Sequence, residues 1–291
     1  MGVLKTKSVN KPFIGMQIPL WNLETSVELI EGPINSGRSA DIWKGEFDGL
    51  EVAVKIYRPI FDDGGLLDES VEREYSIFCD DNRIVSALGR GIINFRNDRW
   101  SHVLVLPMIH CEALSELINN GKMKKLERLS ICKEITNALI GLHNFGMIHG
   151  DLNPNNILAS PDTGEAFIVD FEFSMPLIRE VFEGNNYNTA RGTPGYIAPE
   201  VDSKGINAIS SSSDVWSLGW TIAEVLNRKN MPINRNWRKH EENNNSKISM
   251  LEAWNSEFGE DIDEAVRKCV IIDKNRRIKL EELEEALTKY E

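Results

Sequence analysis

A chain of 291 residues with 41% apolar residues exceeds one average domain and is long enough to form a globular protein with a substantial core. The 45 acidic residues outnumber the 33 basic ones, and the formal net charge of -12 disfavours general affinity for nucleic acid or anionic membrane. The cysteines form no CxxC pair and no secretory signal peptide precedes them, so we expect neither disulfides nor a zinc site at Cys79, Cys111, Cys132 and Cys269.

The first six residues, MGVLKT, place Gly2 and Thr6 at the spacing of an N-myristoylation signal. A glycine after the initiator is common and a single acyl chain binds membranes only marginally, so a disordered start is the stronger interpretation. We expect residues 1–25 to be an N-terminal extension whose first part is disordered. The longest apolar run, Val103 to Ile109, is strand-sized, so we expect a cytoplasmic protein without a transmembrane segment, peripheral to a membrane only if Gly2 is acylated.

The next part of the chain has the pattern of a β-sheet. From Val27 to Tyr57 apolar residues alternate with polar residues and glycines, most clearly at Asp41–Gly45 and Glu51–Lys55, which predicts antiparallel strands. A helix is predicted at Glu69–Cys79, and further strands follow it to about Ile109.

The C-terminal part is predicted to be mainly helical. The pattern changes after Leu114, and residues 126–144 have helical periodicity. A shift in composition near His110 predicts a lobe boundary. The polar run from His240 to Lys247 is predicted to be an exposed loop.

A loop near the middle of the chain carries a carboxylate and an amide at a spacing suited to one site. In the segment His149–Leu158, Asp151 precedes Asn156 by five residues. A second carboxylate, Asp170, follows the apolar strand Phe167–Val169. One carboxylate can orient an attacking hydroxyl and accept its proton, while the other carboxylate and the amide offer hard oxygen ligands to Mg²⁺ on phosphates. This pattern indicates phosphoryl transfer.

Two upstream features fit the same chemistry. Lys55 ends the apolar strand Val52–Val54 and is followed by Glu74 in a predicted helix, so an ion pair can steady the lysine against phosphate oxygens. The segment Asn35–Ile42 is a turn of small residues, where backbone N–H groups around Gly37 can lie over phosphates.

These elements together resemble the eukaryotic protein kinase domain, and the resemblance extends from about Val27 to Tyr290. It rests on the order of the motifs, which are the glycine-rich loop, Lys55, Glu74, the loop His149–Asn156, Asp170 and the APE motif Ala198–Glu200. Further along, Asp214–Gly219 resembles the central helix of the C-lobe. Asp273–Arg277 resembles a late motif whose arginine, Arg277, is expected to pair with Glu200.

The segment Gly192–Glu200, GTPGYIAPE, resembles the substrate-positioning loop of serine/threonine kinases. The sequences ADIWKG, VAVK and HGD look closest to the tyrosine-kinase-like branch of these kinases. The resemblance therefore implies phosphate transfer from ATP to serine or threonine hydroxyls of protein substrates.

The resemblance implies an α+β, bilobal fold with a kinase domain at residues 26–291. Its small antiparallel β-rich N-lobe would span about 26–109, and its larger, mainly helical C-lobe would span about 110–291. ATP is expected to bind in a cleft between the lobes together with Mg²⁺, with Mn²⁺ as the alternative metal.

The resemblance also implies roles for single residues. Asp151 is the expected base and hydroxyl orienter, Lys55 the expected phosphate contact, and Asn153 a weaker candidate for substrate contact. Asn156 and Asp170 are the expected metal ligands. The residues expected to bind the nucleotide are Ile34, Gly37, Ile42, Ala53, Lys55, Glu74, Pro107 and Ile109, with Leu106 as gatekeeper beside the adenine pocket.

Several positions depart from the family pattern. The flanking glycines of the glycine-rich loop are replaced by Asn35 and Ala40. Asn153 stands where serine/threonine kinases usually carry a lysine, and the loss of this positive charge is expected to slow the chemistry. Glu172 replaces the glycine of the DFG motif, and Gly150 replaces the arginine of the HRD motif.

The loss of that arginine weakens a common switch, because phosphorylation at Thr189 or Tyr187 would lack its usual cationic receiver. We interpret Thr193 as a hydrogen-bond partner of Asp151, and His149 as a packed core residue.

Three functions fit these observations. The first is an active protein kinase, which the acidic, metal-binding and lysine positions favour. The second is a pseudokinase or scaffold that signals through protein contacts, which Asn153 and Glu172 make worth considering. The third is a small-molecule phosphotransferase of similar fold, which the GTPGYIAPE segment disfavours. The sequence predicts no oligomeric state.

Overall fold

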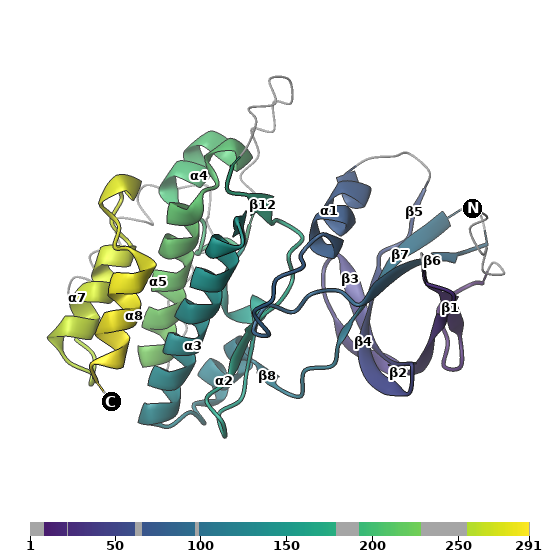
Figure 1. Ribbon diagram of the computed structural model, residues 1–291, viewed down its shortest axis with the longest axis horizontal. Coiled ribbons are helices and arrows are strands. Elements are labelled where there is room, and N and C mark those ends of the chain that lie inside the picture. The colour runs from purple at the N-terminus through teal and green to yellow at the C-terminus, as the bar shows by residue number, and fades with distance from the viewer. Residues whose placement is uncertain are drawn as a thin grey trace. The chain divides into compact units, whose positions relative to one another are not determined.

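The computed structural model describes residues 9–21, 23–61, 66–96, 99–178, 192–227 and 255–290. The chain divides into an N-terminal unit, residues 1–78 and 85–110, and a C-terminal unit, residues 79–84 and 111–291 (Figure 1). Assignment of segment 79–84 to the C-terminal unit was not predicted from the sequence. The predictions for Gly2, Tyr187, Thr189 and the loop His240–Lys247 lie outside the described residues.

The N-terminal unit is built on an antiparallel sheet of seven strands. The order is β1-β2-β3-β4-β7-β5, and β6 pairs with β7 along the edge opposite β4 and β5. Both strands predicted around residues 41–55 are present, joined by a tight turn at Asp48 and Gly49. The strands are β1 Gln17–Pro19, β2 Ser26–Ser36, β3 Ala40–Phe47, β4 Leu50–Tyr57, β5 Ile60–Phe61, β6 Gly89–Asn94 and β7 Arg99–Pro107.

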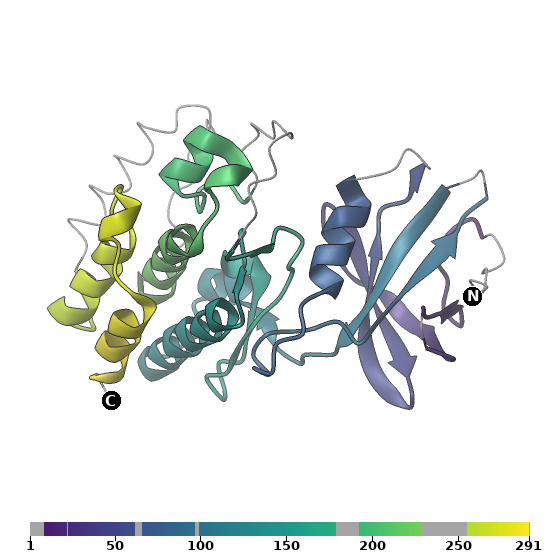
Figure 2. The same ribbon diagram turned by 45° about the horizontal axis from the view of Figure 1, so that its top comes forward.

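The two faces of this sheet bury different apolar sets, because neighbouring residues of a strand point to opposite faces. One face forms a core of aliphatic and aromatic side chains that includes Ile18, Leu29, Val54 and Val105. The other face carries Tyr57 and Leu104 and packs against the helix α1, Leu66–Tyr75 (Figure 2).

Helix α1 begins earlier and ends earlier than the predicted range of Glu69–Cys79. Its last turn closes at Ser76, where the backbone N–H donates to Glu72 O at 2.9 Å and the hydroxyl donates to Arg73 O at 2.8 Å. A serine side chain that bonds the backbone competes with continuation of the helix. The predicted C-terminal end was therefore wrong by one turn.

The segment before β2 is part of the sheet in its described residues. Strand β1 pairs with β2, Val9 bridges Phe95, and Leu20 bridges Gly91. Met16, Ile18 and Leu20 are buried in the core of the sheet. The predicted extension of residues 1–25 therefore contributes to the core of the N-terminal unit from Val9 onward.

The C-terminal unit is mainly helical, as predicted. Helix α5 is buried at nearly every position, and its indole rings Trp216 and Trp220 pack edge to face with centroids 6.1 Å apart. Helices α3 and α7 pack against α5, and α8 packs against α3 and α7. The helices are α2 Leu114–Asn120, α3 Lys125–Asn144, α4 Pro199–Lys204, α5 Ser211–Asn227, α7 Glu260–Cys269 and α8 Leu280–Thr288.

Short strands and turns of this unit hold the loops that carry the predicted chemistry. Strands β8, β10 and β11 form a small antiparallel sheet, and β9 pairs with β12. They are β8 Glu112–Ala113, β9 Met147–Ile148, β10 Ile157–Ala159, β11 Ala166–Ile168 and β12 Met175–Pro176, with 3-10 turns at Pro154–Asn156, Gly205–Ala208 and Lys274–Arg276. None of the helices in the described ranges has the length and apolar character needed to cross a membrane.

The close approach of the N-terminal segment to β6 gives a stability prediction. A Cβ atom added at Gly91 would lie 2.5 Å from Pro19 O, so the backbone of the segment would have to shift. We expect Gly91→Ala to lower the free energy of unfolding by about 1–3 kcal/mol, the usual cost of overpacking. Denaturant unfolding measures this change. Leu50→Ala, at a side chain 69% exposed, is the control and should change stability by less than about 0.5 kcal/mol. Equal stability of the Gly91→Ala and wild-type proteins would contradict the packing.

Candidate active site

The loop between β9 and β10 is fixed by one buried carboxylate of helix α5. Asp214 accepts hydrogen bonds from the backbone N–H groups of His149 at 2.8 Å and Gly150 at 3.0 Å, and from His143 Nε2 at 2.9 Å. Asp214 is 1% exposed. A buried carboxylate needs such partners, because an unpaired one would carry a large desolvation cost. The bonds therefore set the backbone conformation immediately before Asp151.

His149 is a packed core residue, as predicted. It is fully buried, its Nε2 lies 3.1 Å from Val169 O, and its ring lies 5.2 Å from the ring of Phe171. Its Nδ1 accepts a hydrogen bond from the backbone N–H of Asp151 at 3.2 Å. The imidazole thus joins the loop to the segment that carries Asp170.

Gly150 occupies a position that a side chain would strain. Its φ is 78°, in the left-handed region that favours glycine, and an added Cβ would lie 2.5 Å from Phe173 O. At this position, where the family usually carries an arginine, the backbone of this chain passes too close to Phe173 O to accommodate a side chain without a shift.

We expect Gly150→Ala to move the loop between β9 and β10, because neither the positive φ nor the contact with Phe173 O suits a Cβ. The expected result is a loss of about 1–3 kcal/mol in the free energy of unfolding, measured by denaturant titration. Gly121→Ala is a matched control with φ 64° and open space around its Cβ, so it carries the backbone cost alone. A smaller loss at Gly150 than at Gly121 would contradict the steric argument.

The Asp151 carboxylate is bound by Thr193, as predicted. Thr193 N donates to Oδ1 at 2.6 Å, and Thr193 Oγ1 lies 3.1 Å from Oδ2. Burial raises the pKa of Asp151, while the backbone N–H of Thr193 acts in the opposite direction and the charge of Asp170 adds to the rise. Asp151 is thus a more basic carboxylate than an exposed aspartate, held in a fixed orientation.

Asn153 does not have the predicted role of a substrate contact within this geometry. It is 1% exposed. Its Nδ2 donates to Asp151 O at 2.8 Å and to Thr193 Oγ1 at 3.1 Å, and its Oδ1 accepts from Asn155 N at 3.0 Å. An amide can donate and accept at once, which a lysine cannot. The residue that replaces the family lysine therefore bridges Asp151 and Thr193 inside the loop.

Asn156 and Asp170 provide oxygen donors of the kind that suits a hard divalent cation. Asn156 Nδ2 donates to Asp151 O at 2.8 Å, which leaves the amide oxygen as the group able to act as a metal ligand. Asp170 has φ 65°, rare for a residue with a side chain, and follows Val169, whose N–H donates to Asn156 O at 3.0 Å. This backbone bond fixes the two ligand segments side by side.

The donor set fits a metal that is shared with phosphate oxygens. Within the described part of the chain, no group of three or more His, Cys, Asp or Glu side chains could hold a metal ion by itself. One carboxylate and one amide leave most positions around a divalent cation to water and phosphate, which is how Mg²⁺ is usually held.

In the N-terminal unit, the predicted ion pair between Lys55 and Glu74 is confirmed. Lys55 Nζ lies 2.9 Å and 2.7 Å from the two carboxylate oxygens, and the residues are 5% and 3% exposed. Tyr57 OH also donates to Glu74 Oε2 at 2.5 Å. Sequence analysis missed Tyr57, although its place two residues after Lys55 on a strand puts both side chains on one face.

The other residues predicted to bind nucleotide lie on strands of the same sheet, except Gly37 in a turn and Ile109 beyond the end of β7. In the turn between β2 and β3, Gly37 N donates to Ala40 O at 2.8 Å, and Gly37 O accepts from Arg58 Nη2 at 2.9 Å. Ala53 is opposite Leu106 in the register of β4 and β7. Ile34 is 47% exposed, and the half-buried residues of the predicted set are Ile42, Ala53, Pro107 and Ile109.

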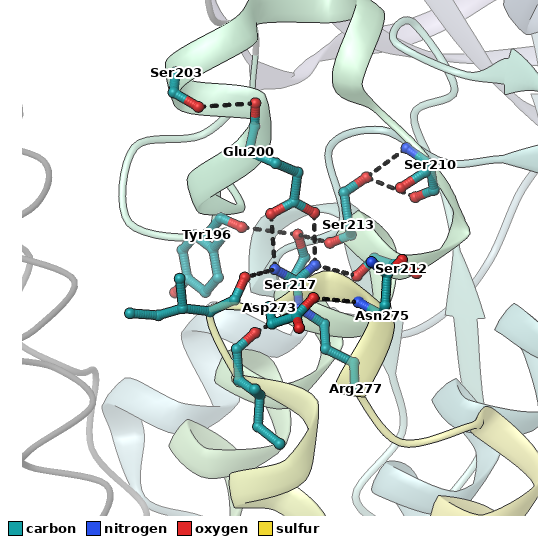
Figure 3. Close-up of polar contacts among 12 residues, drawn as sticks. Tyr196, Glu200, Ser203, Ser210, Ser212, Ser213, Ser217, Asp273, Asn275 and Arg277 are labelled. Atoms are coloured by element: carbon teal, nitrogen blue, oxygen red, sulfur yellow. Dashed lines mark hydrogen bonds and ion pairs between the residues drawn. The ribbon is translucent and has the colours of Figure 1, made fainter.

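The segment after Thr193 is anchored by the predicted pair of Arg277 and Glu200 (Figure 3). Arg277 Nη1 and Nη2 donate to the carboxylate oxygens at 2.6 Å and 2.7 Å, and Nη1 also donates to Ser212 O at 2.7 Å. Ser217 Oγ donates to Tyr196 O at 2.8 Å from helix α5. This bidentate, buried pair holds the start of α4 against α5.

Comparison with known proteins agrees with this geometry. Residues 34–287 match the model of the protein kinase domain. The chain is 31% identical to human Myosin-IIIa over 94% of this chain and 17% of the relative. It is 29% identical to serine/threonine-protein kinase dst2 of Dictyostelium discoideum, over 74% of this chain and 18% of the relative.

It is also 26% identical to serine/threonine-protein kinase shk1/pak1 of Schizosaccharomyces pombe, over 70% of this chain and 29% of the relative. The chain thus spans less than a third of the length of each of these three relatives. They are of the STE-group type rather than clearly tyrosine-kinase-like, so the predicted likeness to that branch is corrected. The names of these kinases do not favour the pseudokinase alternative.

Proposed function

The chain belongs to the protein kinase domain family, and from this premise we propose that it transfers the γ-phosphate of ATP to serine or threonine hydroxyls of protein substrates. The observation that carries the proposal is the way Asp151 is held in place. Asp214 accepts a hydrogen bond from the backbone N–H of the preceding residue, Gly150, and Thr193 bonds both oxygens of the Asp151 carboxylate. A generic surface aspartate would have no such support.

In this proposal Asp151 accepts the hydroxyl proton of the substrate. One carboxylate oxygen orients the hydroxyl, and the proton moves to that carboxylate as the oxygen attacks phosphorus. The raised pKa of Asp151, caused mainly by burial, makes it a better proton acceptor than an exposed aspartate. Thr193 holds the carboxylate through two hydrogen bonds, and Asn153 holds the backbone carbonyl of Asp151.

Asn156 and Asp170 are proposed to hold the divalent metal, and Lys55 is proposed to contact the phosphates. The metal supplies charge neutralisation on the phosphate oxygens when it is bound. The Glu74 carboxylate holds the Lys55 ammonium, and Tyr57 OH donates to that carboxylate. The lysine is therefore already ordered when a phosphate arrives. The choice of Mg²⁺ over Mn²⁺ is part of the proposal.

The specificity for serine and threonine is supported by two observations. The segment Gly192–Glu200 has the sequence GTPGYIAPE, and the dst2 and shk1/pak1 relatives are named serine/threonine-protein kinases. Thr193 and Tyr196 of this segment are fixed by Asp151 and Ser217. We further propose a cytoplasmic location, in line with the unpaired cysteines.

The direct prediction concerns Asp151→Asn. Removal of the base should lower kcat for transfer of labelled phosphate to a generic basic protein by about 10²–10⁴-fold. Affinity for ATP with Mg²⁺ should stay within about threefold, because Asp151 is proposed to act on the hydroxyl rather than on the nucleotide. Radiolabel incorporation and nucleotide titration measure the two quantities.

Asp162→Asn is the matched control, because it makes the same Asp-to-Asn change at an exposed turn of the C-terminal unit that has no proposed role in the reaction. Phospho-amino-acid analysis should find phosphoserine or phosphothreonine in the product. Wild-type protein that binds ATP with Mg²⁺ but transfers no phosphate would contradict the proposed function and favour a scaffold.

A further inference from the structure

Helix α1 has a second attachment to the sheet besides the pair of Lys55 and Glu74. We propose that Arg90 and Trp21 form a clamp that positions α1, so that Glu74 meets Lys55. The inference rests on the proposed function only where it concerns turnover. The position of α1 itself can be measured without catalysis.

The register of the sheet places the two cations in one row. Lys55 on β4 and Arg90 on β6 are both opposite Leu104 of the intervening strand β7. Directly opposite residues of antiparallel strands point to the same face, and neighbouring strands are about 4.8 Å apart. Lys55 and Arg90 therefore project from one face of the sheet about 10 Å apart, and this is the face that α1 covers.

Each cation takes a different side of the helix. Lys55 binds Glu74, whereas Arg90 forms an ion pair with Glu72, and its guanidinium carbon lies 4.7 Å from the ring centre of Tyr75. Glu72 and Tyr75 are three residues apart and neighbours on one helical face, while Glu74 is two residues from Glu72 and points elsewhere. Two attachments on different sides oppose rotation of α1 about its own axis, which one attachment cannot do.

The clamp is completed by the segment that precedes the matched kinase range. The Trp21 ring centre lies 4.9 Å from the Arg90 guanidinium carbon, and Trp21 N donates to Arg90 O at 2.7 Å. Leu20 bridges Gly91, which fixes the segment on the edge of β6. The family model begins at residue 34, so Trp21 is a contribution of this chain outside the matched range.

The stacking, more than the ion pair, gives the clamp its strength. The side chains of Arg90 and Glu72 are 18% and 56% exposed, and a pair with one exposed partner contributes little because water screens it. A guanidinium in contact with two aromatic rings gains from its planar shape as well as its charge. A lysine at this position would keep the charge and lose the planar contact.

The test uses the 291-residue chain and four variants of it. They are Trp21→Ala, Arg90→Met, Arg90→Lys and the double variant Trp21→Ala with Arg90→Met. Lys44→Met is the matched control, since it removes the Lys44 and Glu51 ion pair from the same sheet away from α1. Hydrogen exchange of residues 66–75 reports the helix, and phosphate transfer reports kcat and the KM for ATP.

We expect Trp21→Ala and Arg90→Met each to speed exchange in α1 about three- to tenfold, with the exchange of helix α5 unchanged. The double variant should match Arg90→Met, because both residues act through one stack. Arg90→Lys should exchange faster than wild type and slower than Arg90→Met. If the protein transfers phosphate, kcat should fall in the same order as exchange in α1 rises. The thermal unfolding midpoint of each variant should stay within a few degrees of wild type. Lys44→Met should change neither the exchange of α1 nor kcat.

Unchanged exchange in α1 for both single variants would overturn the clamp, as would equal effects of Arg90→Met and Lys44→Met. If wild-type protein transfers no phosphate but Arg90→Met still loosens α1, the proposed function fails and the clamp stands. If transfer is normal in every variant while α1 exchanges faster, the positioning role in catalysis is refuted.

Discussion

The buried carboxylate of Asp214 is the contact on which the geometry of the C-terminal unit depends. It accepts from the backbone N–H groups of His149 and Gly150 in the loop between β9 and β10 and from His143 of α3, so one side chain joins α5, α3 and that loop. Because α5 is itself buried at nearly every position, this carboxylate is carried by an element of the core. The orientation of Asp151, one residue beyond Gly150, follows from this anchor.

A second layer of bonds is built on this anchor by residues that depart from the family pattern. Gly150 allows the chain to pass close to Phe173 O, and Asn153 uses its whole amide to connect Asp151, Asn155 and Thr193. The chain has lost two positive charges that the family usually carries there. The hydrogen bonds of Asn153 and Thr193 instead hold Asp151 within the unit, which limits the number of conformations available to its carboxylate.

Much of this arrangement could be predicted from the sequence, because motif order identifies residues whose neighbours are fixed by the fold. The pairs Lys55 with Glu74, Thr193 with Asp151 and Arg277 with Glu200 were predicted and are confirmed. The contribution of Trp21 and the role of Asn153 were not predicted. Both depend on contacts between distant segments, Trp21 with Arg90 and Asn153 with Thr193, and a local pattern carries no signal for them.

The most direct measurement is steady-state phosphate transfer by Asp214→Asn, compared with wild type, together with the affinity for ATP. An amide at this position turns one of its acceptors into a donor and leaves a loop N–H without its partner. The account predicts a fall in kcat of about 10²-fold from the displaced base, with ATP affinity within about threefold of wild type and α5 still folded by circular dichroism. A folded Asp214→Asn protein with wild-type kcat would contradict the claim that this carboxylate holds the base in its working position.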